Sequence, residues 1–362
     1  MSSSEAQPKG PIKMAILDDY QNISRPYFKD FPPSSLEVTV FTDTISPSDD
    51  LPALVSRLHP YSIICTMRER TPFPAALITS LPNLRLLLTT GTRNAALDLA
   101  ALRAANIPVA GTDTDPAASA GRAATTKPVS KTNQHTWALI LGLANNVARD
   151  DAAVKAGAWQ DHLPMSTYLA GQTFACLGLG KLGVMAARVA VLAFGMRVLA
   201  WSQSLTQEAA DAKAREAGLP EGTFEVVGSK AELFERADVL SVHYVLSPRS
   251  EGIVGAKELA AMKTSALFVN SSRGPLVDED ALFEVLNQGR IRGAALDVFW
   301  KEPLPKDSRW RTTAWGKDGR SQVLMTPHTG FVSEETMHGW YMATAENVRR
   351  FLDGQELTTR LA

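Results

Sequence analysis

The chain has 362 residues, of which 45% are hydrophobic and 21% charged, and its net charge is −1. These values are ordinary for a globular protein, and the length predicts two domains. The charge gives no electrostatic reason to expect nucleic acid or a membrane surface as a partner, and no window reaches the apolar length of a membrane span. The polar first eleven residues lack the apolar core of a signal peptide, and Cys65 and Cys176 lie in apolar, strand-like runs. We therefore expect a reducing, cytoplasmic location and no metal site.

The first third of the chain alternates short β-rich runs with helix-like segments, which is typical of a parallel α/β sheet of flavodoxin-like type. The predicted strands are residues 12–17, 36–41, 62–66, 84–90 and 107–110. Residues 111–130 break this rhythm and predict a linker. After the linker, apolar residues from Trp137 to Ala148 recur at spacings of three and four, which predicts one long helix.

A second alternation begins near residue 173. Its predicted strands are residues 173–177, 197–201, 224–227, 239–242, 266–270, 293–297 and 323–326. Thr206 and Asp278 are placed to cap helices, and a last helix is predicted from Ser333 to about Gly354. We expect that helix to return to the first domain, which is then discontinuous. The predicted domains are residues 1–130 plus 331–362 and residues 131–330.

Residues 178–183 form a glycine-rich motif between a predicted strand and a predicted helix. Gly178 permits the tight turn, Gly180 lets the backbone approach phosphates, and Gly183 lets the helix touch the strand. The phosphates then meet free N–H groups at the helix start. A glycine-rich turn alone is common, but these flanks favour a dinucleotide-binding unit.

Three polar side chains follow predicted strands of this second half: Arg273, Glu302 and His328. Singly, they fit a surface salt bridge, a turn carboxylate and a loop histidine. Ligands of open α/β sheets bind beyond the carboxyl ends of the strands, so jointly the three favour a functional cluster. The planar guanidinium of an arginine suits a carboxylate, a histidine donates a proton near neutral pH, and an adjacent glutamate orients the ring and favours its protonated form. This chemistry reduces a 2-oxo acid when a nicotinamide supplies hydride.

With these motifs, and with residues 90–94, 169–173 and 262–263, the chain resembles the D-isomer-specific 2-hydroxyacid dehydrogenases. Formate, glycerate and phosphoglycerate dehydrogenases and hydroxypyruvate reductases are relatives within that family. The resemblance implies two Rossmann-like or flavodoxin-like α/β domains with parallel sheets, a discontinuous substrate domain and a homodimer. It implies hydride transfer between NAD(P)H and a 2-oxo acid, giving a D-2-hydroxy acid. In that reaction Arg273 binds and polarises the substrate, and Glu302 pairs with the acid/base His328.

The resemblance also assigns residues around the reacting groups. Asp297 holds the nicotinamide amide. The other residues expected to bind the cofactor are Gly178, Gly180, Lys181, Leu182, Gly183, Ser202, His243, Ser271 and Ser272. In the first domain, the backbone at Gly91 and Thr92 meets the substrate carboxylate, and residues 67–71, with Arg70, form a second substrate-facing loop.

The sequence departs from the family pattern in four places. NAD users of this family usually carry an acidic residue that binds the adenosine ribose hydroxyls, but residues 201–204 are Trp-Ser-Gln-Ser. No arginine lies nearby in sequence to bind a 2′-phosphate. The cofactor is therefore expected to be NAD or NADP, with NAD favoured. Gln134 stands where relatives often carry glutamate, at a position expected to be structural. The linker, residues 115–130, is long. Residues 309–322 form an insertion containing Trp310, Arg311 and Trp315, which either folds over the cleft or is a surface excursion.

Two alternatives remain open in the sequence. A dinucleotide-sensing, co-repressor-like binding protein of the same fold keeps all three polar residues, but such proteins usually carry extended tails, which favours the enzyme here. The second alternative is formate oxidation, for which the family resemblance implies glutamine at position 302. The chain has glutamate there, which disfavours this alternative. The sequence does not specify the 2-oxo acid.

Overall fold

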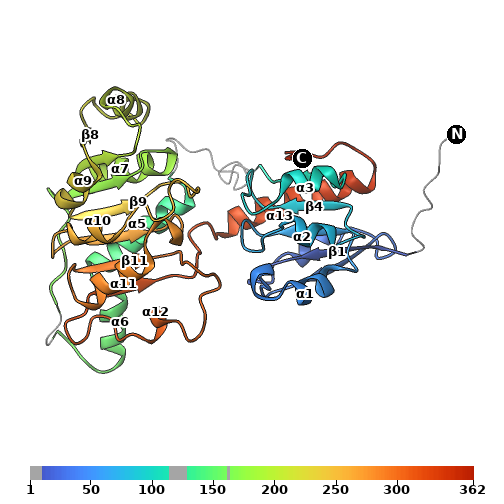
Figure 1. Cartoon of the computed structure of the whole chain (residues 1–362), viewed down its shortest axis with the longest axis horizontal. Helices are drawn as coiled ribbons and strands as arrows, with labels where there is room; N and C mark the ends of the chain where they lie inside the picture. Colours follow the sequence, from blue (N-terminus) through green and yellow to red (C-terminus); the bar gives the residue numbers. More distant parts are fainter. Residues whose placement is uncertain (1–9, 114–128, 161–163) are drawn as a thin grey trace. The chain divides into compact units, whose positions relative to one another are not determined.

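The structure is a computed structural model, and it describes residues 10–113, 129–160 and 164–362. The chain divides into two compact units, Met1–Thr126 with Ser333–Ala362, and Lys127–Val332 (Figure 1). The long linker expected at residues 115–130 falls almost entirely outside the described residues. Each unit is described by itself below.

The first unit is built on a five-stranded, all-parallel sheet in the order β2-β1-β3-β4-β5. This strand order is that of flavodoxin-like folds, so the expected type of sheet is confirmed. Its strands are β1 (Ile12–Ile16), β2 (Leu36–Val40), β3 (Ile63–Thr66), β4 (Leu86–Thr89) and β5 (Val109–Ala110). Its helices are η1 (Arg25–Phe28), α1 (Pro47–Leu58), α2 (Ala75–Thr79), α3 (Leu99–Ala104) and α13 (Glu334–Leu352).

Helix α13 joins the first unit although it follows the second unit in sequence. Ser333 caps it by accepting a hydrogen bond from Thr336 N–H, and the helix packs against η1 and β4. Its inner face buries Met337, Tyr341 and Val348 at 2% exposure or less. These apolar side chains pack within the first unit, because burying an apolar stripe is the main stabilisation available to an amphipathic helix.

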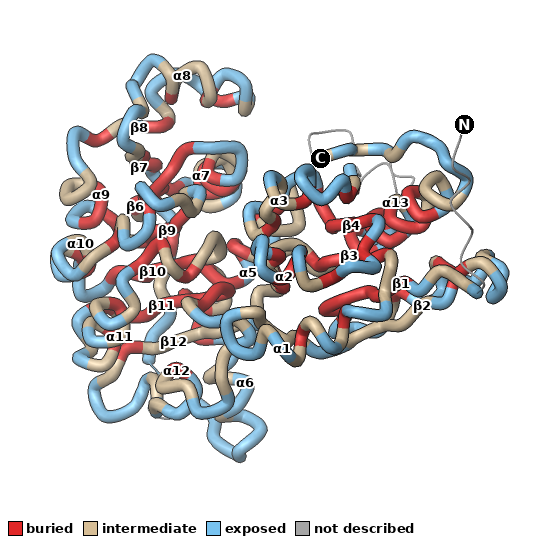
Figure 2. The backbone as a smooth tube through the Cα atoms, turned by 45° about the vertical axis from the view of Figure 1, so that its right-hand side comes forward, coloured by how far each residue is buried: buried red, intermediate tan, exposed pale blue. Residues whose placement is uncertain are grey.

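The second unit is built on a seven-stranded, all-parallel sheet in the order β12-β11-β10-β9-β6-β7-β8. Its strands are β6 (Thr173–Leu177), β7 (Arg197–Trp201), β8 (Phe224–Val226), β9 (Val239–Val242), β10 (Leu267–Asn270), β11 (Gly293–Leu296) and β12 (Gln322–Met325). Its helices are α5 (Lys131–Ala144), α6 (Val147–Lys155), α7 (Lys181–Phe194), α8 (Gln207–Glu216), α9 (Lys230–Arg236), α10 (Ala256–Ala260), η2 (Gly274–Leu276), α11 (Glu279–Asn287) and α12 (Arg309–Thr312). Strands β6, β9, β10 and β11 are buried throughout, as in Figure 2, because helices cover both faces of such sheets.

The prediction of one long helix through Ala148 is wrong at its C-terminal end. Helix α5 stops at Ala144, and Asn146 adopts a left-handed conformation with φ 56°. Side chains after this break, including Val147, are exposed. The apolar spacing continued by chance into α6, whereas asparagine tolerates positive φ and marks the turn.

The 309–322 insertion combines a buried anchor with a largely exposed chain. Trp310 is only 1% exposed and stacks between Trp300 and Trp315, at ring-centroid distances of 5.4 and 5.7 Å. Its indole N–H donates to Glu279 Oε1 at 2.9 Å, and Phe283 packs on it edge-on. The insertion is therefore anchored on α11 by Trp310, while Arg311, Thr312 and residues 316–319 are exposed.

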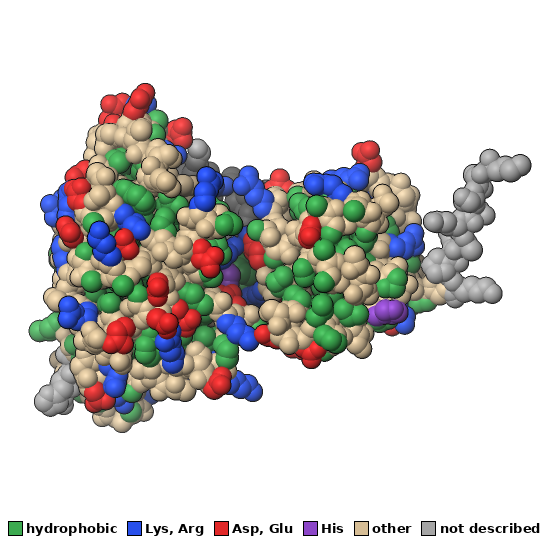
Figure 3. Space-filling view, viewed as in Figure 1, with side chains coloured by type: hydrophobic (Ala, Val, Ile, Leu, Met, Phe, Trp, Pro, Cys, Tyr) green, Lys and Arg blue, Asp and Glu red, His purple; other side chains and the backbone are tan. Residues whose placement is uncertain are grey.

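Lysine, arginine, aspartate and glutamate side chains are interspersed over both units on the face seen in Figure 3. Among the residues that the structure describes, no helix is both long and apolar enough to cross a membrane.

Candidate active site

The strands of the second unit end in register, which sets the residues after them side by side. The pairs Leu177↔Val242, Val242↔Asn270, Asn270↔Leu296 and Leu296↔Met325 align the last residues of β6, β9, β10, β11 and β12. The residues that come next along this carboxyl edge are Gly178, His243, Ser271, Asp297 and Thr326. Leu177 also pairs with Trp201 of β7, which adds Ser202 to the same edge. One sheet edge therefore carries most of the residues predicted to bind the cofactor.

The glycine-rich motif forms a tight turn from β6 into α7. Gly178 has φ +98°, and a Cβ there would lie 2.8 Å from the carbonyl oxygen of His243. Gly180 is the N-cap of α7, with open space where a side chain would begin, and Lys181 and Leu182 follow it as exposed residues. This arrangement fits a bound pyrophosphate, because backbone N–H groups at a helix start are left open to a ligand.

Gly183→Ala is expected to lower both stability and dinucleotide affinity. A Cβ at Gly183 would lie 2.2 Å from Gly178 O and 2.9 Å from Cys176 Sγ, so the turn and helix must separate. Overpacking of this kind costs about 1–3 kcal/mol. Thermal denaturation and NADH fluorescence titration measure the two effects. Gly180→Ala is the matched control, expected to keep the wild-type Tm; a Gly183→Ala protein with an unchanged Tm would contradict the packing account.

Glu302 and His328 are paired directly. Nδ1 of His328 lies 2.5 Å from Glu302 Oε2, and the other carboxylate oxygen accepts from Phe299 N–H at 2.8 Å. The two side chains are 28% and 22% exposed, so the pair is partly shielded yet reachable. Because the Glu302 carboxylate accepts from Nδ1, the imidazole is held in one orientation, and Nε2 is the ring nitrogen not bonded to Glu302.

Arg273 lies on the loop after β10, next to the loop that carries Glu302. Gly274 packs so closely on Phe299 that a Cβ would meet its carbonyl carbon at 2.2 Å. The Arg273 backbone is fixed by Asn270, whose Nδ2 donates to its carbonyl oxygen at 2.9 Å, and its Nη1 donates to Ser272 O at 2.7 Å. Since β10, β11 and β12 are adjacent and parallel, Arg273, Glu302 and His328 emerge at one edge of the sheet.

Asp297 is nearly buried, with its side chain 1% exposed, and four donors surround its carboxylate. Oδ1 accepts from Thr326 Oγ1 at 2.6 Å and Thr329 N–H at 2.9 Å and lies 3.1 Å from His135 Nε2, while Oδ2 accepts from Gly330 N–H at 2.9 Å. Burial alone raises the pKa of Asp297, but the hydrogen bonds from His135 and Thr326 outweigh it and hold this pKa below its usual range. The carboxylate thus stays ionised.

The other predicted cofactor residues are engaged within the unit. The Ser271 hydroxyl lies 2.7 Å from Thr136 Oγ1, and Ser272 Oγ donates to Val242 O at 2.7 Å. The His243 ring is 2.9 Å from Ser241 Oγ, and burial lowers the pKa of His243 to about 4, so it is neutral at physiological pH.

Ser202 is half-buried at the end of β7, and the loop after it is held by Tyr244, whose hydroxyl accepts from Gln203 N–H at 3.1 Å. Residues 201–204 contain neither a carboxylate nor a cation.

In the first unit, the predicted substrate-facing loops follow β3 and β4. Arg70 places its guanidinium 4.9 Å from the ring centroid of Tyr20, and Arg68 Nη1 lies where a side chain on Gly91 would begin. In this structure the Gly91 N–H donates to Thr112 Oγ1 at 2.7 Å, and the Gly91 carbonyl oxygen accepts from Thr112 N–H at 3.0 Å. Thr92 is exposed.

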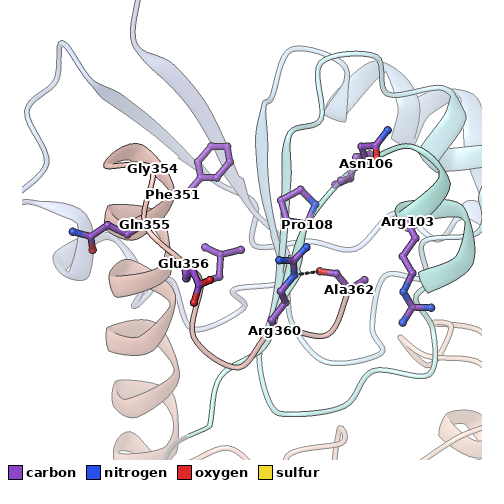
Figure 4. A pocket seen from close by; sticks show the side chains of 11 residues that line it. Arg103, Asn106, Pro108, Phe351, Gly354, Gln355, Glu356, Arg360 and Ala362 are labelled. Atoms are coloured by element: carbon purple, nitrogen blue, oxygen red, sulfur yellow. Dashed lines mark hydrogen bonds between the residues drawn. The ribbon is translucent and has the colours of Figure 1, made fainter.

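A cavity of about 540 Å³ lies elsewhere on the first unit (Figure 4). It is lined by Pro108, which precedes β5, and by residues after α13, so it lies away from the strand ends that carry the predicted substrate loops. Its two arginines already donate to backbone carbonyls, Arg103 to Leu361 O and Arg360 to Ala362 O. We assign it no role in the site.

No group of three or more histidine, cysteine, aspartate or glutamate side chains suited to a metal ion occurs among the residues described here. The contribution of His135 and Thr136 was not predicted from the sequence, which gave these two residues no role. A helix start capped by Ser130, with polar side chains directed inward, is the signal that marks them.

Comparisons with known proteins support the geometry. Residues 137–330 match the model of the "D-isomer specific 2-hydroxyacid dehydrogenase, NAD binding domain". A D-3-phosphoglycerate dehydrogenase of Methanocaldococcus jannaschii is 34% identical over 61% of this chain, and a glyoxylate reductase of Aeropyrum pernix is 33% identical over 62%. These matches cover 38% and 64% of the two relatives, less than two thirds of each.

Among solved structures, a phosphoglycerate oxidoreductase from Vibrio cholerae O395 is similar over 95% of this chain and 99% of its own, with a TM-score of 0.78 and 32% identity. The nicotinamide dinucleotide domain predicted from the glycine motif is thereby confirmed at the level of the family.

Proposed function

Because this chain belongs to the D-isomer-specific 2-hydroxyacid dehydrogenases, we propose that it transfers hydride between NAD(P)H and a 2-oxo acid, giving a D-2-hydroxy acid. The Glu302–His328 pair, 2.5 Å apart on the sheet edge that also carries Arg273, is the observation that supports this most strongly. The test is oxidation of NADH or NADPH by the purified protein with glyoxylate, hydroxypyruvate and larger 2-oxo acids. Turnover that requires both the acid and His328 supports the proposal.

Arg273, His328 and Glu302 have different roles in the proposed reaction. The Arg273 guanidinium presents two parallel donors that bind the substrate carboxylate and polarise the neighbouring carbonyl. His328 holds a proton on Nε2 and gives it to the oxygen that becomes an alkoxide, while Glu302 keeps the ring oriented through Nδ1. A nicotinamide cofactor, when bound, supplies the hydride.

The residues along the sheet edge fit that cofactor. In the proposal, the backbone of Gly178, Gly180 and Gly183, with Lys181 and Leu182, holds the pyrophosphate. The Gly178 conformation and the open space at Gly180 support this role. Ser202 faces the adenosine ribose. The residues proposed around the nicotinamide and its ribose are His243, Ser271, Ser272 and Asp297.

Ser202→Asp is expected to penalise NADPH and to leave NADH use equal or better. The added carboxylate repels a 2′-phosphate and accepts from ribose hydroxyls. We propose NAD as the preferred cofactor, since residues 201–204 offer no cation to a phosphate. The measurement is kcat/KM for both cofactors, with Ser202→Ala to separate added charge from loss of the hydroxyl. An unchanged NADH/NADPH ratio in Ser202→Asp means that Ser202 does not face the ribose.

We propose further substrate contacts from the first unit, namely Arg70 and the backbone at Gly91 and Thr92. Arg70 Nη1 lies 3.4 Å from Asp18 O and the guanidinium lies over Tyr20, so the cation is held at a strand end. The proposed contact at Gly91 requires its N–H to exchange Thr112 Oγ1 for the substrate carboxylate, because a carbonyl oxygen does not donate a hydrogen bond.

We propose that the protein is a homodimer through residues 147–160 and 164–168. Helix α6 buries none of its residues, and the large apolar side chains exposed by more than half in this segment are Val147, Val154, Trp159, Met165 and Tyr168. A group of exposed, large apolar side chains on one surface segment is typical of a protein–protein interface. The Trp159→Glu, Tyr168→Glu double variant is expected to run as a monomer in light scattering, whereas Met342→Glu, exposed on α13, stays dimeric. A monomeric wild type would refute this assembly.

A reducing, cytoplasmic location is proposed from the thiols. Cys65 and Cys176 are both free and buried. Burial raises the pKa of Cys65 to about 12 and also raises that of Cys176, so both stay protonated and unreactive. Fractionation of cells expressing the tagged protein tests the location.

A further inference from the structure

The first two turns of α5 contact four separate segments of the second unit. Asn133 Nδ2 donates to Leu182 O, just after the glycine motif, at 2.9 Å, and Thr136 Oγ1 lies 2.7 Å from the Ser271 hydroxyl. His135 lies between them in sequence and points to the ends of β11 and β12. These contacts join segments far apart in the chain, so α5 does more than cover the sheet.

The hydrogen on His135 can be placed from its partners. Its Nε2 is 3.1 Å from Asp297 Oδ1 and 3.0 Å from Thr326 Oγ1. Thr326 gives its single hydroxyl hydrogen to Asp297 Oδ1 at 2.6 Å, and an ionised carboxylate only accepts. Nε2 is therefore the donor, and its N–H is shared between the carboxylate and the hydroxyl.

Asp297 in turn holds the turn that carries His328. His328 N–H donates to the Asp297 carbonyl oxygen at 2.7 Å, and the N–H groups of Thr329 and Gly330 donate to its carboxylate, each at 2.9 Å. His328 itself has φ +51°, a left-handed conformation that a non-glycine residue keeps only where its surroundings fix it. The three bonds from Asp297 contribute to that fixing.

Gly330 shows how closely this turn fits. A Cβ there would lie 2.8 Å from Asp297 Oδ2 and 3.4 Å from His135 Cδ2. A shift of the Asp297 carboxylate is therefore transmitted to the backbone of residues 328–330.

We propose that His135 is a positioning residue for His328, acting through Asp297 and the 328–330 turn. The expected effect on kcat rests on the proposed function, whereas the expected effect on the 328–330 turn does not. His135→Leu removes the Nε2–H, leaves a buried carboxylate short of one donor and loosens the turn. A displacement of about 1 Å at a reacting group costs roughly 10²-fold in rate, so kcat is expected to fall by about that factor.

Two readouts test the proposal on the full-length protein. The first is kcat at saturating NADH together with the Kd for NADH, for wild type, His135→Leu and His135→Gln. Glutamine replaces Nε2–H with an amide N–H, so it is expected to restore kcat to within a few-fold. The second is hydrogen exchange at Thr329 and Gly330, which is expected to speed up in His135→Leu and return toward wild type in His135→Gln.

Trp137→Phe is the matched control for α5. It removes the bond from Trp137 Nε1 to Ala186 O, 3.3 Å long, and weakens the same helix without touching Asp297. It is expected to lower the Tm while leaving kcat and exchange at 329–330 as in wild type. Equal kcat losses in Trp137→Phe and His135→Leu would overturn the proposal.

The remaining outcomes are also decisive. A His135→Leu protein with weaker NADH binding and unchanged kcat would overturn the proposal, because His135 would then affect only the contact of Asp297 with the cofactor and not the 328–330 turn. Unchanged exchange at Thr329 and Gly330 would overturn it too, whether or not the wild type reduces a 2-oxo acid. If wild type shows no turnover, the proposed function fails, and faster exchange in His135→Leu alone still supports the positioning of the turn.

Discussion

His328→Ala is expected to lower kcat for 2-oxo acid reduction by roughly 10²–10⁴, the usual size of general acid catalysis. The variant loses the proton donor that Glu302 holds at 2.5 Å, and nothing else at the sheet edge replaces it in that position. The backbone of the turn is bonded through the His328 N–H, which alanine keeps, so the Kd for NADH is expected to stay near wild type.

Steady-state rates and a fluorescence titration measure the two quantities separately. His59→Ala, an exposed histidine at the end of α1, is the control and is expected to behave as wild type. A His328→Ala enzyme with wild-type kcat would show that another group donates the proton.

Arg273→Lys is expected to reduce kcat/KM by roughly 10²-fold, comparable to the loss of one transition-state donor. Lysine keeps the positive charge and loses the planar pair of donors, so recognition of the carboxylate weakens in the ground state as well. The inhibitor constants of oxalate and oxamate report that loss directly.

The matched control is Arg290→Lys, an exposed arginine of the same unit, for which no change is expected. If Arg273→Lys binds oxamate as tightly as wild type, the carboxylate is held elsewhere, and Arg70 becomes the first residue to substitute.

The sequence was sufficient to predict the structure where local signals and strand order agree. The glycine motif, the caps at Thr206, Asp278 and Ser333, and both all-parallel sheets follow from short-range chemistry and period. Because parallel strands share one carboxyl edge, the sequence could also bring Arg273, Glu302 and His328 together before any distance was known.

What it could not show depends on contacts between distant segments. His135 and Asp297 are 162 positions apart, and no helical period says which loop a side chain meets. Trp310 was open to two interpretations because its burial depends on Phe283 and Trp300, outside the insertion. The bond from Gly91 N–H to Thr112 likewise depends on how two loops approach each other.

Hydride transfer to a 2-oxo acid is proposed at the carboxyl edge of the second unit. The most direct measurement uses NADH deuterated at the transferring position of the nicotinamide, with glyoxylate, hydroxypyruvate and larger 2-oxo acids, followed by recovery of the product. We expect deuterium on the C2 carbon of a 2-hydroxy acid, in amounts equal to the NADH consumed, and a D configuration wherever C2 is a stereocentre. Tight NADH binding with no deuterium in any product would contradict it and would identify a dinucleotide-sensing protein instead.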